Sequence, residues 1–353
     1  YEWSWKDGRS RWDLLDVVRT ARALRPEGIE WPVDKDGKPT NRLELLSKLN
    51  GLEHEKAHDA LSDVEALIGV TKLINEKHTQ LYEYLLKIRD KKEIKQLVNL
   101  DEKKPFVYVS GRYDAQYNKA TIAFPLTSAA HGNVLVYDLR YDPISFVSLS
   151  KKELEKKIYA SWDERKKDDF VKLPVKQLQY NHCPAIAPVG VLAQHDGWAK
   201  ISLDQKTVET HRNTLLAHPD FAERLRDIFE NKPEFKKIKD PEAQLYEGFL
   251  ADRDRVRVEA VRNASESQLA DFNPEFQDER LPELLLHYKA RSFPKSMSEA
   301  DQHVWEEWRA ERIQSQLQPF MNRLQALSKQ GKDSFIIKEL QLWAETVLPV
   351  DDY

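Results

Sequence analysis

Hydrophobic periodicity changes twice along this chain, and these changes limit the fold more than any other feature of the sequence. Apolar residues recur at helical spacing up to about residue 78, short runs rich in Val, Ile, Phe and Tyr follow, and helical spacing returns after about residue 240. A charged, Pro-punctuated stretch at 231–241 separates the last two parts. The pattern predicts an α+β multidomain protein with domains at 1–78, 79–230 and 231–353.

The first part is expected to be helical, and the second to form a small β-barrel or curled sheet with helices. In the first part, helices are predicted at 12–24, at 43–49 and from just after residue 58 to residue 74. A basic helical run at 87–95 opens the second part. Strands are predicted at 106–110, 121–126, 133–139, 144–149 and 175–180, with helices at 151–161 and between 203 and 229.

The last part is expected to contain helices only. They are predicted at 244–250, 255–262, 281–291, 300–317, 320–329 and 334–347.

Composition limits the kind of protein. A net charge of -4 argues against a uniformly basic nucleic-acid binder but allows a local basic groove. No run of about 18 apolar residues predicts a membrane span, and no signal peptide is recognised. Cys183 is the only cysteine, so the sequence predicts no internal disulfide and a cytoplasmic location.

The pair His58 and Asp63 is the strongest candidate for a chemical site. A helix starting after His58 would carry Asp63 in an early turn, and five helical residues turn through roughly 500°, so the two side chains converge only if His58 lies in the preceding loop. A carboxylate on a helix below an imidazole suits a metal site. On this short pattern alone, a loop histidine and a solvated aspartate are the better interpretation.

Wider motifs reverse that preference. They are Ser10–Val17, Ala23–Ile29, Arg42–Leu46, Ala57–Ala60, Ala243–Phe249 and Tyr288–Pro294. With them, the whole chain resembles the bacterial exodeoxyribonuclease I family of DEDDh 3′→5′ exonucleases. The resemblance implies the C-terminal part of an RNase H-like α/β exonuclease domain, an SH3-like β domain with helices, and an all-helical C-terminal domain.

The resemblance also implies a mechanism. His58 would be the general base, Asp63 a metal ligand beside two Mg²⁺ ions, and Arg42 a substrate-binding residue. The family's Asp-x-Glu and a further Asp match nothing in this chain, so we expect an N-terminally truncated sequence that is inactive alone, since one Asp cannot hold two ions about 3.5–4 Å apart. We also expect the helices of 1–78 to cover a sheet that this chain does not contain.

Further residues match binding positions of the family. Those matching DNA contacts are Tyr1, Trp5, Arg19, Lys91, Asn133, Tyr159, Asn181, Tyr246 and Phe249. The last two, at i and i+3 of a predicted helix, would share one face as a base-stacking platform. Arg25, Tyr84 and Lys104 match a pocket for the tail of single-stranded-DNA-binding protein (SSB). Pro188 and Ala193 stand where the family has Gln and Arg, so two polar contacts of that pocket would be lost.

Three functions remain open at this point. The first is a Mg²⁺-dependent, monomeric 3′→5′ exonuclease that degrades single-stranded DNA to 5′-mononucleotides in DNA repair. The second is a non-catalytic module that binds single-stranded DNA or SSB. The third is an RNA-directed or proofreading relative, which the domains after Asp63 argue against.

Overall fold

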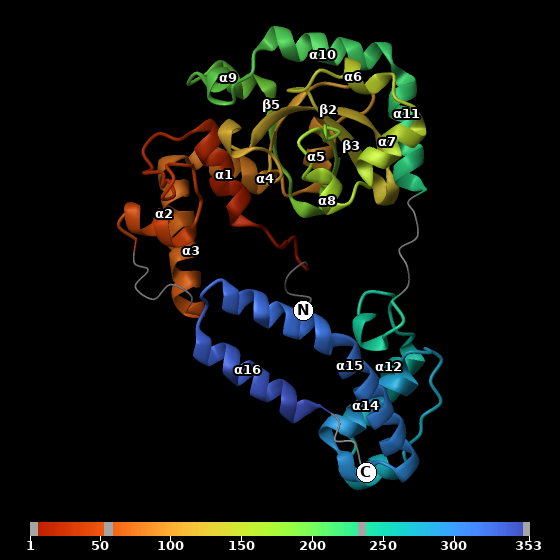
Figure 1. Ribbon diagram of the computed structural model, residues 1–353. Helices are drawn as coiled ribbons and strands as arrows, with labels where there is room; N and C mark the ends of the chain where they lie inside the picture. The colour runs from red at the N-terminus through yellow and green to blue at the C-terminus, as the bar shows by residue number, and fades with distance from the viewer. Residues whose placement is uncertain (1–5, 53–58, 232–237, 349–353) are drawn as a thin grey trace. The chain divides into compact units, whose positions relative to one another are not determined.

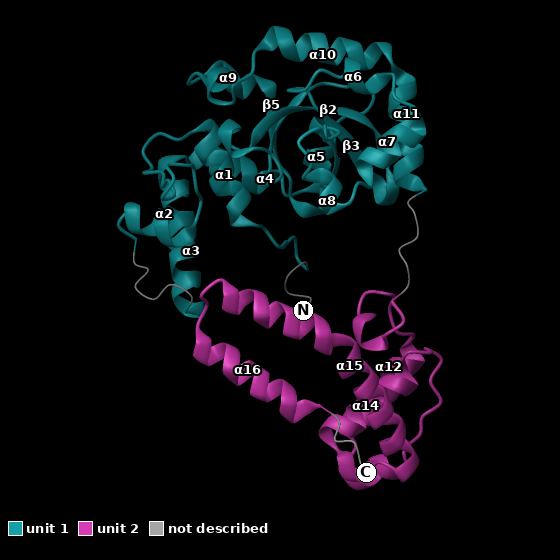
Figure 2. Ribbon diagram, in the orientation of Figure 1, with its two compact units in different colours: residues 1–233 teal, residues 234–353 magenta. Residues whose placement is uncertain are grey.

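The computed structural model describes residues 6–52, 59–231 and 238–348. The chain divides into two compact units, residues 1–233 and 234–353 (Figure 2). The first contains the sheet, and the second is built from helices (Figure 1). Across the described ranges, no helix is long and apolar enough to cross a lipid bilayer. The boundary predicted at residue 78 lies inside the first unit and stays a prediction.

Five antiparallel strands form one sheet in the first unit. They are β1 (Phe106–Val109), β2 (Ala120–Ala129), β3 (Asn133–Asp138), β4 (Val175–Leu178) and β5 (Ala185–Pro188), in the spatial order β4-β3-β2-β1-β5. The register of β2 against β3 shifts between Pro125 and Thr127. Pro125 has no N–H to donate, and a bulge is where a central strand tolerates proline. The sheet curls strongly (Figure 1), as the sequence predicted.

The core of this unit lies inside the curled sheet and between the sheet and its helices. Every residue of β1 and β3 is buried. Helix α11 (Pro219–Glu230) packs on β2, and its fully buried Phe221 meets the Tyr137 ring edge-on at a centroid distance of 6.3 Å. Burial on both faces explains why the strands are nearly continuous apolar runs.

One predicted strand is absent, and one strand was not predicted. Residues 144–149 form the helical turn α6 (Ile144–Val147), because the Asp142 carboxylate accepts a hydrogen bond from the Ile144 N–H and Pro143 fixes its own φ at -72°. Strand β5 was missed because three of its four residues, two Ala and one Pro, are of types depleted in strands. Pairing with β1, in which Val107 opposes Ala187, creates that strand.

Helices precede and follow the strands, and some of them pack on the sheet. Those before it are α1 (Leu14–Leu24), α2 (Leu43–Leu49), α3 (Ala60–Lys77), α4 (Thr79–Lys87) and α5 (Lys91–Leu97). Those after β3 are α6, α7 (Lys151–Ile158), α8 (Trp162–Arg165), α9 (Gly197–Lys200), α10 (Gln205–Ala217) and α11. The predicted helix at 87–95 is divided, because the Asp90 carboxylate accepts a hydrogen bond from the Lys92 N–H and starts a new helix. The Ser161–Glu164 capping box likewise separates α8 from α7.

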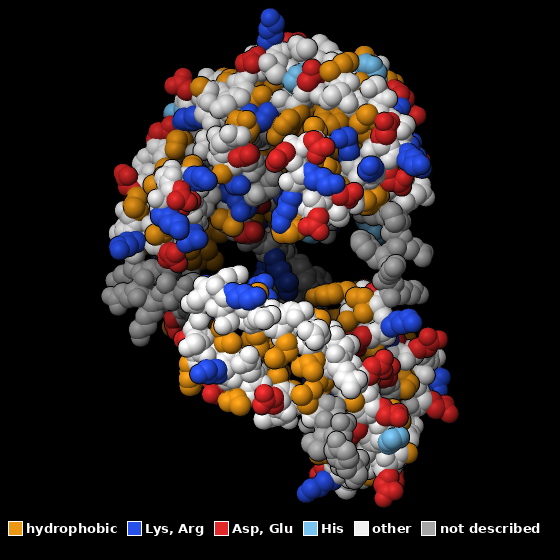
Figure 3. All heavy atoms as spheres, in the orientation of Figure 1, with side chains coloured by type: hydrophobic (Ala, Val, Ile, Leu, Met, Phe, Trp, Pro, Cys, Tyr) orange, Lys and Arg blue, Asp and Glu red, His pale blue; other side chains and the backbone are white. Residues whose placement is uncertain are grey.

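The second unit contains α12 (Asp252–Asn263), α13 (Glu266–Asp271), α14 (Leu281–Ser292), α15 (Glu299–Lys329) and α16 (Ser334–Val347), with no strand among its described residues. The helices predicted at 300–317 and 320–329 are one helix, α15, with Pro319 inside it. Hydrophobic side chains gather over α15 and α16 (Figure 3). Phe335 and Trp343 are 68% and 58% exposed there.

Candidate functional site

Asp63 lies where the sequence placed it, in the first turn of α3. Asp59 caps this helix by accepting a hydrogen bond from the Ser62 N–H at 3.2 Å. His58 lies outside the described residues, as do Tyr1 and Trp5. Across 6–52, 59–231 and 238–348, no group of three or more His, Cys, Asp or Glu side chains is placed to hold a metal ion. The described residues therefore do not fit a complete catalytic metal site, and no step of hydrolysis can be derived from them.

Arg42 precedes α2, and its side chain is 71% exposed. Among the described residues it pairs with Glu44, with Nη1 and Oε1 3.9 Å apart. A guanidinium this exposed, with so weak a partner, can pair with a phosphate in two parallel hydrogen bonds.

A pocket of about 790 Å³ lies in the first unit, between the start of α1, strands β1 and β4, and the segment after β4. Its walls are polar and carry both charges. The lining residues are Arg11, Trp12, Asp13, Asp16, Tyr108, Ser110, Arg112, Lys176, Gln177, Gln179, Asn181, His182 and Pro184. Asn181, which the sequence assigned to DNA binding, is exposed in this wall. Lys176 and Arg112 were not predicted.

Lys176 is the most perturbed group of the pocket. Its Nζ donates to the Ser110 hydroxyl at 2.6 Å and lies 4.0 Å from the ring centroid of Tyr108. Burial first and the nearby Arg112 second lower the pKa of Lys176 from its ordinary 10.5, Asp16 opposes the shift, and the resulting pKa is about 7. At neutral pH the ammonium is thus poised to lose its proton, and an anion entering the pocket would keep it charged.

Arg19 belongs to the same region. Its Nη1 pairs with Asp16 Oδ1 at 2.6 Å, and Asp16 lines the pocket. A Cβ added to Gly111 would lie 2.7–2.9 Å from the Arg19 guanidinium, so only glycine leaves room for it. The structure therefore places one predicted binding residue, Asn181, in the pocket wall, and a second, Arg19, behind that wall as the partner of Asp16.

Three other predicted binding residues lie elsewhere in the first unit. Lys91 is the exposed first residue of α5. Tyr159 follows α7, is 38% exposed, and donates from its hydroxyl to the Ile228 carbonyl at 3.1 Å. Asn133 is buried, and its amide donates to the Ala130 carbonyl in the turn before β3, which gives it a structural role. A DNA contact at each stays a prediction.

The three residues predicted for the SSB pocket surround β5 and the 3₁₀ turn after it. The Tyr84 hydroxyl donates to the Ile186 carbonyl, and burial, followed by the charge of Glu93, raises the pKa of Tyr84 to about 12. Arg25 reaches the Gln194 side chain at 3.5 Å. Lys104 precedes β1, is 73% exposed and pairs with Glu102. Pro188 and Ala193 are exposed on this segment.

The predicted helix at 244–250 is absent. After the 3₁₀ turn Pro241–Ala243 the chain follows an irregular path, because Gly248 has a φ of 150° that L side chains rarely adopt, and because the Gln244 carbonyl accepts from Arg280. Tyr246 and Phe249 are 94% and 96% exposed. The prediction that helical spacing aligns their rings was wrong, although both rings are fully presented to solvent.

Comparison with known proteins agrees with this arrangement. Residues 89–231 match the exonuclease I SH3-like domain, and residues 239–347 match the exonuclease I C-terminal domain. Exodeoxyribonuclease I of Haemophilus influenzae is 36% identical over 336 residues, which cover 95% of this chain and 71% of that protein. The chain belongs to the exodeoxyribonuclease I family.

Solved structures of exonuclease I show the same fold. Escherichia coli exonuclease I in complex with a dA16 oligonucleotide is 33% identical, with a TM-score of 0.83, covering 99% of this chain and 75% of that one. An ExoI/SSB-Ct complex is 32% identical, with a TM-score of 0.80, covering 99% and 74%. These matches confirm the predicted SH3-like and helical domains and the assignment to a family of nucleases, enzymes that hydrolyse nucleic acids.

Proposed function

We propose that this protein binds single-stranded DNA for degradation from its 3′ end to 5′-mononucleotides, in DNA repair and recombination. The pocket lined by Lys176, Arg112 and Asn181, with Arg19 paired to Asp16 in its wall, is the observation that carries this proposal. The structure of the E. coli relative with a dA16 oligonucleotide supports it.

The pocket offers partners both for the charged phosphates and for the polar base edges of a DNA strand. The ammonium of Lys176 and the exposed guanidinium of Arg112 are partners for phosphate oxygens. Gln177, Gln179 and Asn181 offer amide groups that both donate and accept hydrogen bonds, as base edges require. Phosphate contacts of this kind position a strand without reading its sequence.

For catalysis, we propose His58 as general base, Asp63 as a metal ligand and Arg42 as a substrate-binding residue. Two Mg²⁺ ions are the proposed cofactors. They would stabilise the charge that develops on the attacked phosphate. Since the described residues offer no complete set of metal ligands, we also propose that these 353 residues do not hydrolyse DNA alone.

A non-catalytic binding module is the second candidate. It is favoured by the exposed rings of Tyr246 and Phe249 and by the pocket around Lys176, which need no metal to hold a strand. SSB is a proposed partner, on the basis of the ExoI/SSB-Ct complex, with docking weakened by Pro188 and Ala193. A cytoplasmic location and a monomeric state remain predictions.

Release of mononucleotides from 3′-labelled single-stranded DNA with Mg²⁺ tests the proposal. The assay is run on this chain and on any longer reading frame that its gene encodes upstream. Activity only in a longer protein, largely abolished by His58→Ala, is the expected result. Strand binding without activity in either protein would favour the binding module.

A further inference from the structure

The segment 240–250 of the second unit presents three large apolar side chains to solvent. Leu245, Tyr246 and Phe249 are 75%, 94% and 96% exposed. These residues lie outside any helix or strand. Ordering a short irregular segment has a large entropy cost, about 1–2 kcal/mol per residue for the backbone, and the exposed side chains of Leu245, Tyr246 and Phe249 gain little burial to offset it. Something else must therefore hold this segment if its rings are to keep one position.

Charged groups hold the segment at its base. Glu242 is the centre: its Oε1 lies 2.6 Å from Arg291 Nη1 and 2.9 Å from Nδ1 of the buried His287. Arg312 pairs with Asp240, and its Nη1 lies 3.6 Å from Glu242 Oε2. Arginines on two different helices, α14 and α15, thereby fix the start of the segment.

A further contact reaches the edge of the exposed part. The Arg280 guanidinium donates from Nη1 to the Gln244 carbonyl at 2.7 Å, while two other nitrogens bond to Asp278. Gln244 is the residue immediately before Leu245. The Arg280 guanidinium therefore links Gln244, which is next to the exposed side chains, to Asp278, which lies just before α14.

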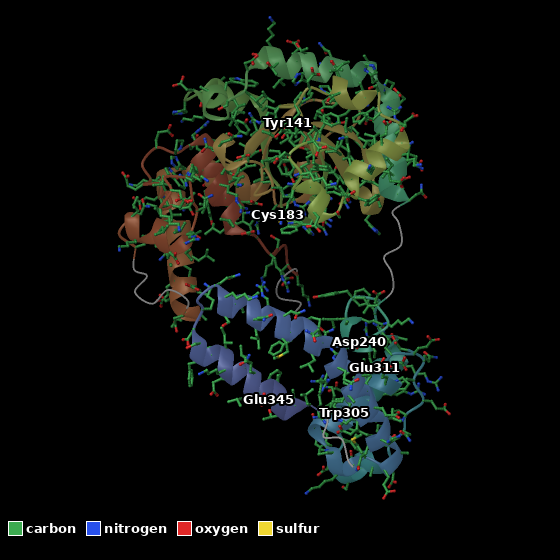
Figure 4. All side chains as sticks on the ribbon, viewed as in Figure 1. Tyr141, Cys183, Asp240, Trp305, Glu311 and Glu345 are labelled. Atoms are coloured by element: carbon green, nitrogen blue, oxygen red, sulfur yellow. The ribbon has the colours of Figure 1, made fainter. Side chains whose placement is uncertain are left out.

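The cations themselves are held by two stacked indoles. Trp305 and Trp308 of α15 have ring centroids 5.0 Å apart and an interplanar angle of 23°. Arg312 lies 4.9 Å above the Trp308 ring, and Arg291 lies 5.3 Å from the Trp305 ring. Asp240 and Trp305 are labelled in Figure 4. A planar guanidinium loses little freedom per hydrogen bond, so the carboxylate and indole contacts together favour one arrangement of these side chains.

We propose that Glu242, Arg280 and Arg312 are positioning residues that hold segment 244–250 ready, so that Tyr246 and Phe249 meet unpaired bases without a prior ordering step. The inference rests on the proposed strand-binding function. It adds that affinity depends on an anchor, formed by Glu242, Arg280 and Arg312, whose side chains do not touch the strand. Holding a binding segment in its bound form raises affinity by removing the entropy cost from the binding step.

A double-mutant cycle tests the anchor. Glu242→Gln and Arg312→Met are each combined with the pair Tyr246→Ala and Phe249→Ala in the full chain, and the affinity for a fluorescent oligo-dT strand is measured by anisotropy. Loss of both rings should weaken binding by at least roughly fivefold. Each anchor variant should weaken it by roughly three- to tenfold with the rings present, and by less than twofold without them.

Chymotrypsin provides a second readout, since it cleaves after Tyr and Phe. Cleavage after Tyr246 and Phe249, followed by mass spectrometry, should be several-fold faster in both anchor variants. Glu306→Gln is the control, because it removes an ion pair of 2.6 Å to Arg309 that is confined to α15. Arg312 is 46% exposed in its side chain, so Arg312→Met decides the outcome if Glu242→Gln does not fold.

The outcomes separate the two proposals. If ring removal leaves affinity unchanged, the role of this segment in strand binding fails, and the inference fails with it. If ring removal weakens binding but the anchor variants weaken it equally with and without the rings, only the anchor is overturned. Unchanged cleavage and affinity in both anchor variants would also overturn it.

Discussion

Replacing Lys176 by Met should make the protein more stable near neutral pH and a weaker binder of single-stranded DNA. Met retains most of the apolar stem of the side chain but removes the ammonium, which lies over the rings of Tyr108 and Tyr113. The wild-type ammonium is partly buried close to Arg112, and Asp16 is an opposing charge. Lys176 therefore destabilises the folded protein when no anion is bound in the pocket, and a bound phosphate would offset that cost.

The magnitude follows from the shift in pKa. The pKa of Lys176 falls from 10.5 to about 7, so between pH 7 and 10.5 the unfolded chain binds more protons than the folded one. The free energy of unfolding then rises with pH by up to about 1.4 kcal/mol per pH unit. Cation–π contacts with Tyr108 and Tyr113 offset part of this. From pH 7 to pH 9, the wild type should gain about 2 kcal/mol relative to Lys176→Met.

Urea denaturation of the wild type and of Lys176→Met at pH 7 and pH 9 measures this difference. NMR of lysines labelled with ¹³C at Cε gives the pKa directly, since the signal of Lys176 is the one absent from the variant. Binding of oligo-dT at pH 6.5 should weaken roughly fivefold in the variant, with the salt dependence reduced by about 0.7 in its log–log slope. A Lys176 midpoint near 10, or the same pH dependence of stability in both proteins, would refute the reasoning.

Three further changes have defined outcomes. Gly111→Ala should displace the Arg19 guanidinium, because the new Cβ would lie within 2.9 Å of it. The affinity for single-stranded DNA should then fall as much as in Arg19→Ala. Unchanged affinity in Gly111→Ala, with reduced affinity in Arg19→Ala, would contradict this. Phe221→Ala should lower the free energy of unfolding by about 3–5 kcal/mol in urea, since the ring is fully buried against Tyr137. Burial raises the pKa of Glu242, but Arg291 and His287 outweigh burial and leave that pKa below the ordinary 4.5. The stabilisation by the ionised Glu242 is therefore present above pH 4.5 and is lost as the pH falls through the lowered pKa. Glu242→Gln should remove this acid-dependent part of the thermal stability, as thermal unfolding at several pH values would show.

Local signals in the sequence identified many helices well. The bounds of α2 and α16 were predicted to the residue, because Asn50-Gly51 ends the first and Asp333 caps the second. The failures came where a tertiary contact or one backbone angle decided the structure. Strand β5 exists only by pairing with β1, and the path of 244–250 depends on Gly248 and on Arg280, 36 residues away from Gln244.

The residues of the candidate site also include some that the sequence predicted and some that it did not. Arg19 and Asn181 were predicted through the family resemblance, yet nothing local joins them, since they are 162 positions apart in the sequence. Lys176 was missed because it reads as an ordinary lysine in a short strand. Its partner Ser110 follows β1, and its charged neighbours lie on α1 and after β1. Only the folded arrangement shows that this lysine is chemically unusual.

Helix α3 has a practical consequence for anyone who handles this chain. Leu61, Val64, Leu67 and Ile68 leave 43–66% of their surface exposed along one helix. Water-exposed apolar stripes of this kind promote self-association, and they resemble the surfaces that chaperones recognise. Preparations of these 353 residues should therefore form soluble aggregates at high concentration, and replacing Leu61 and Ile68 by Glu should suppress them, as light scattering would show.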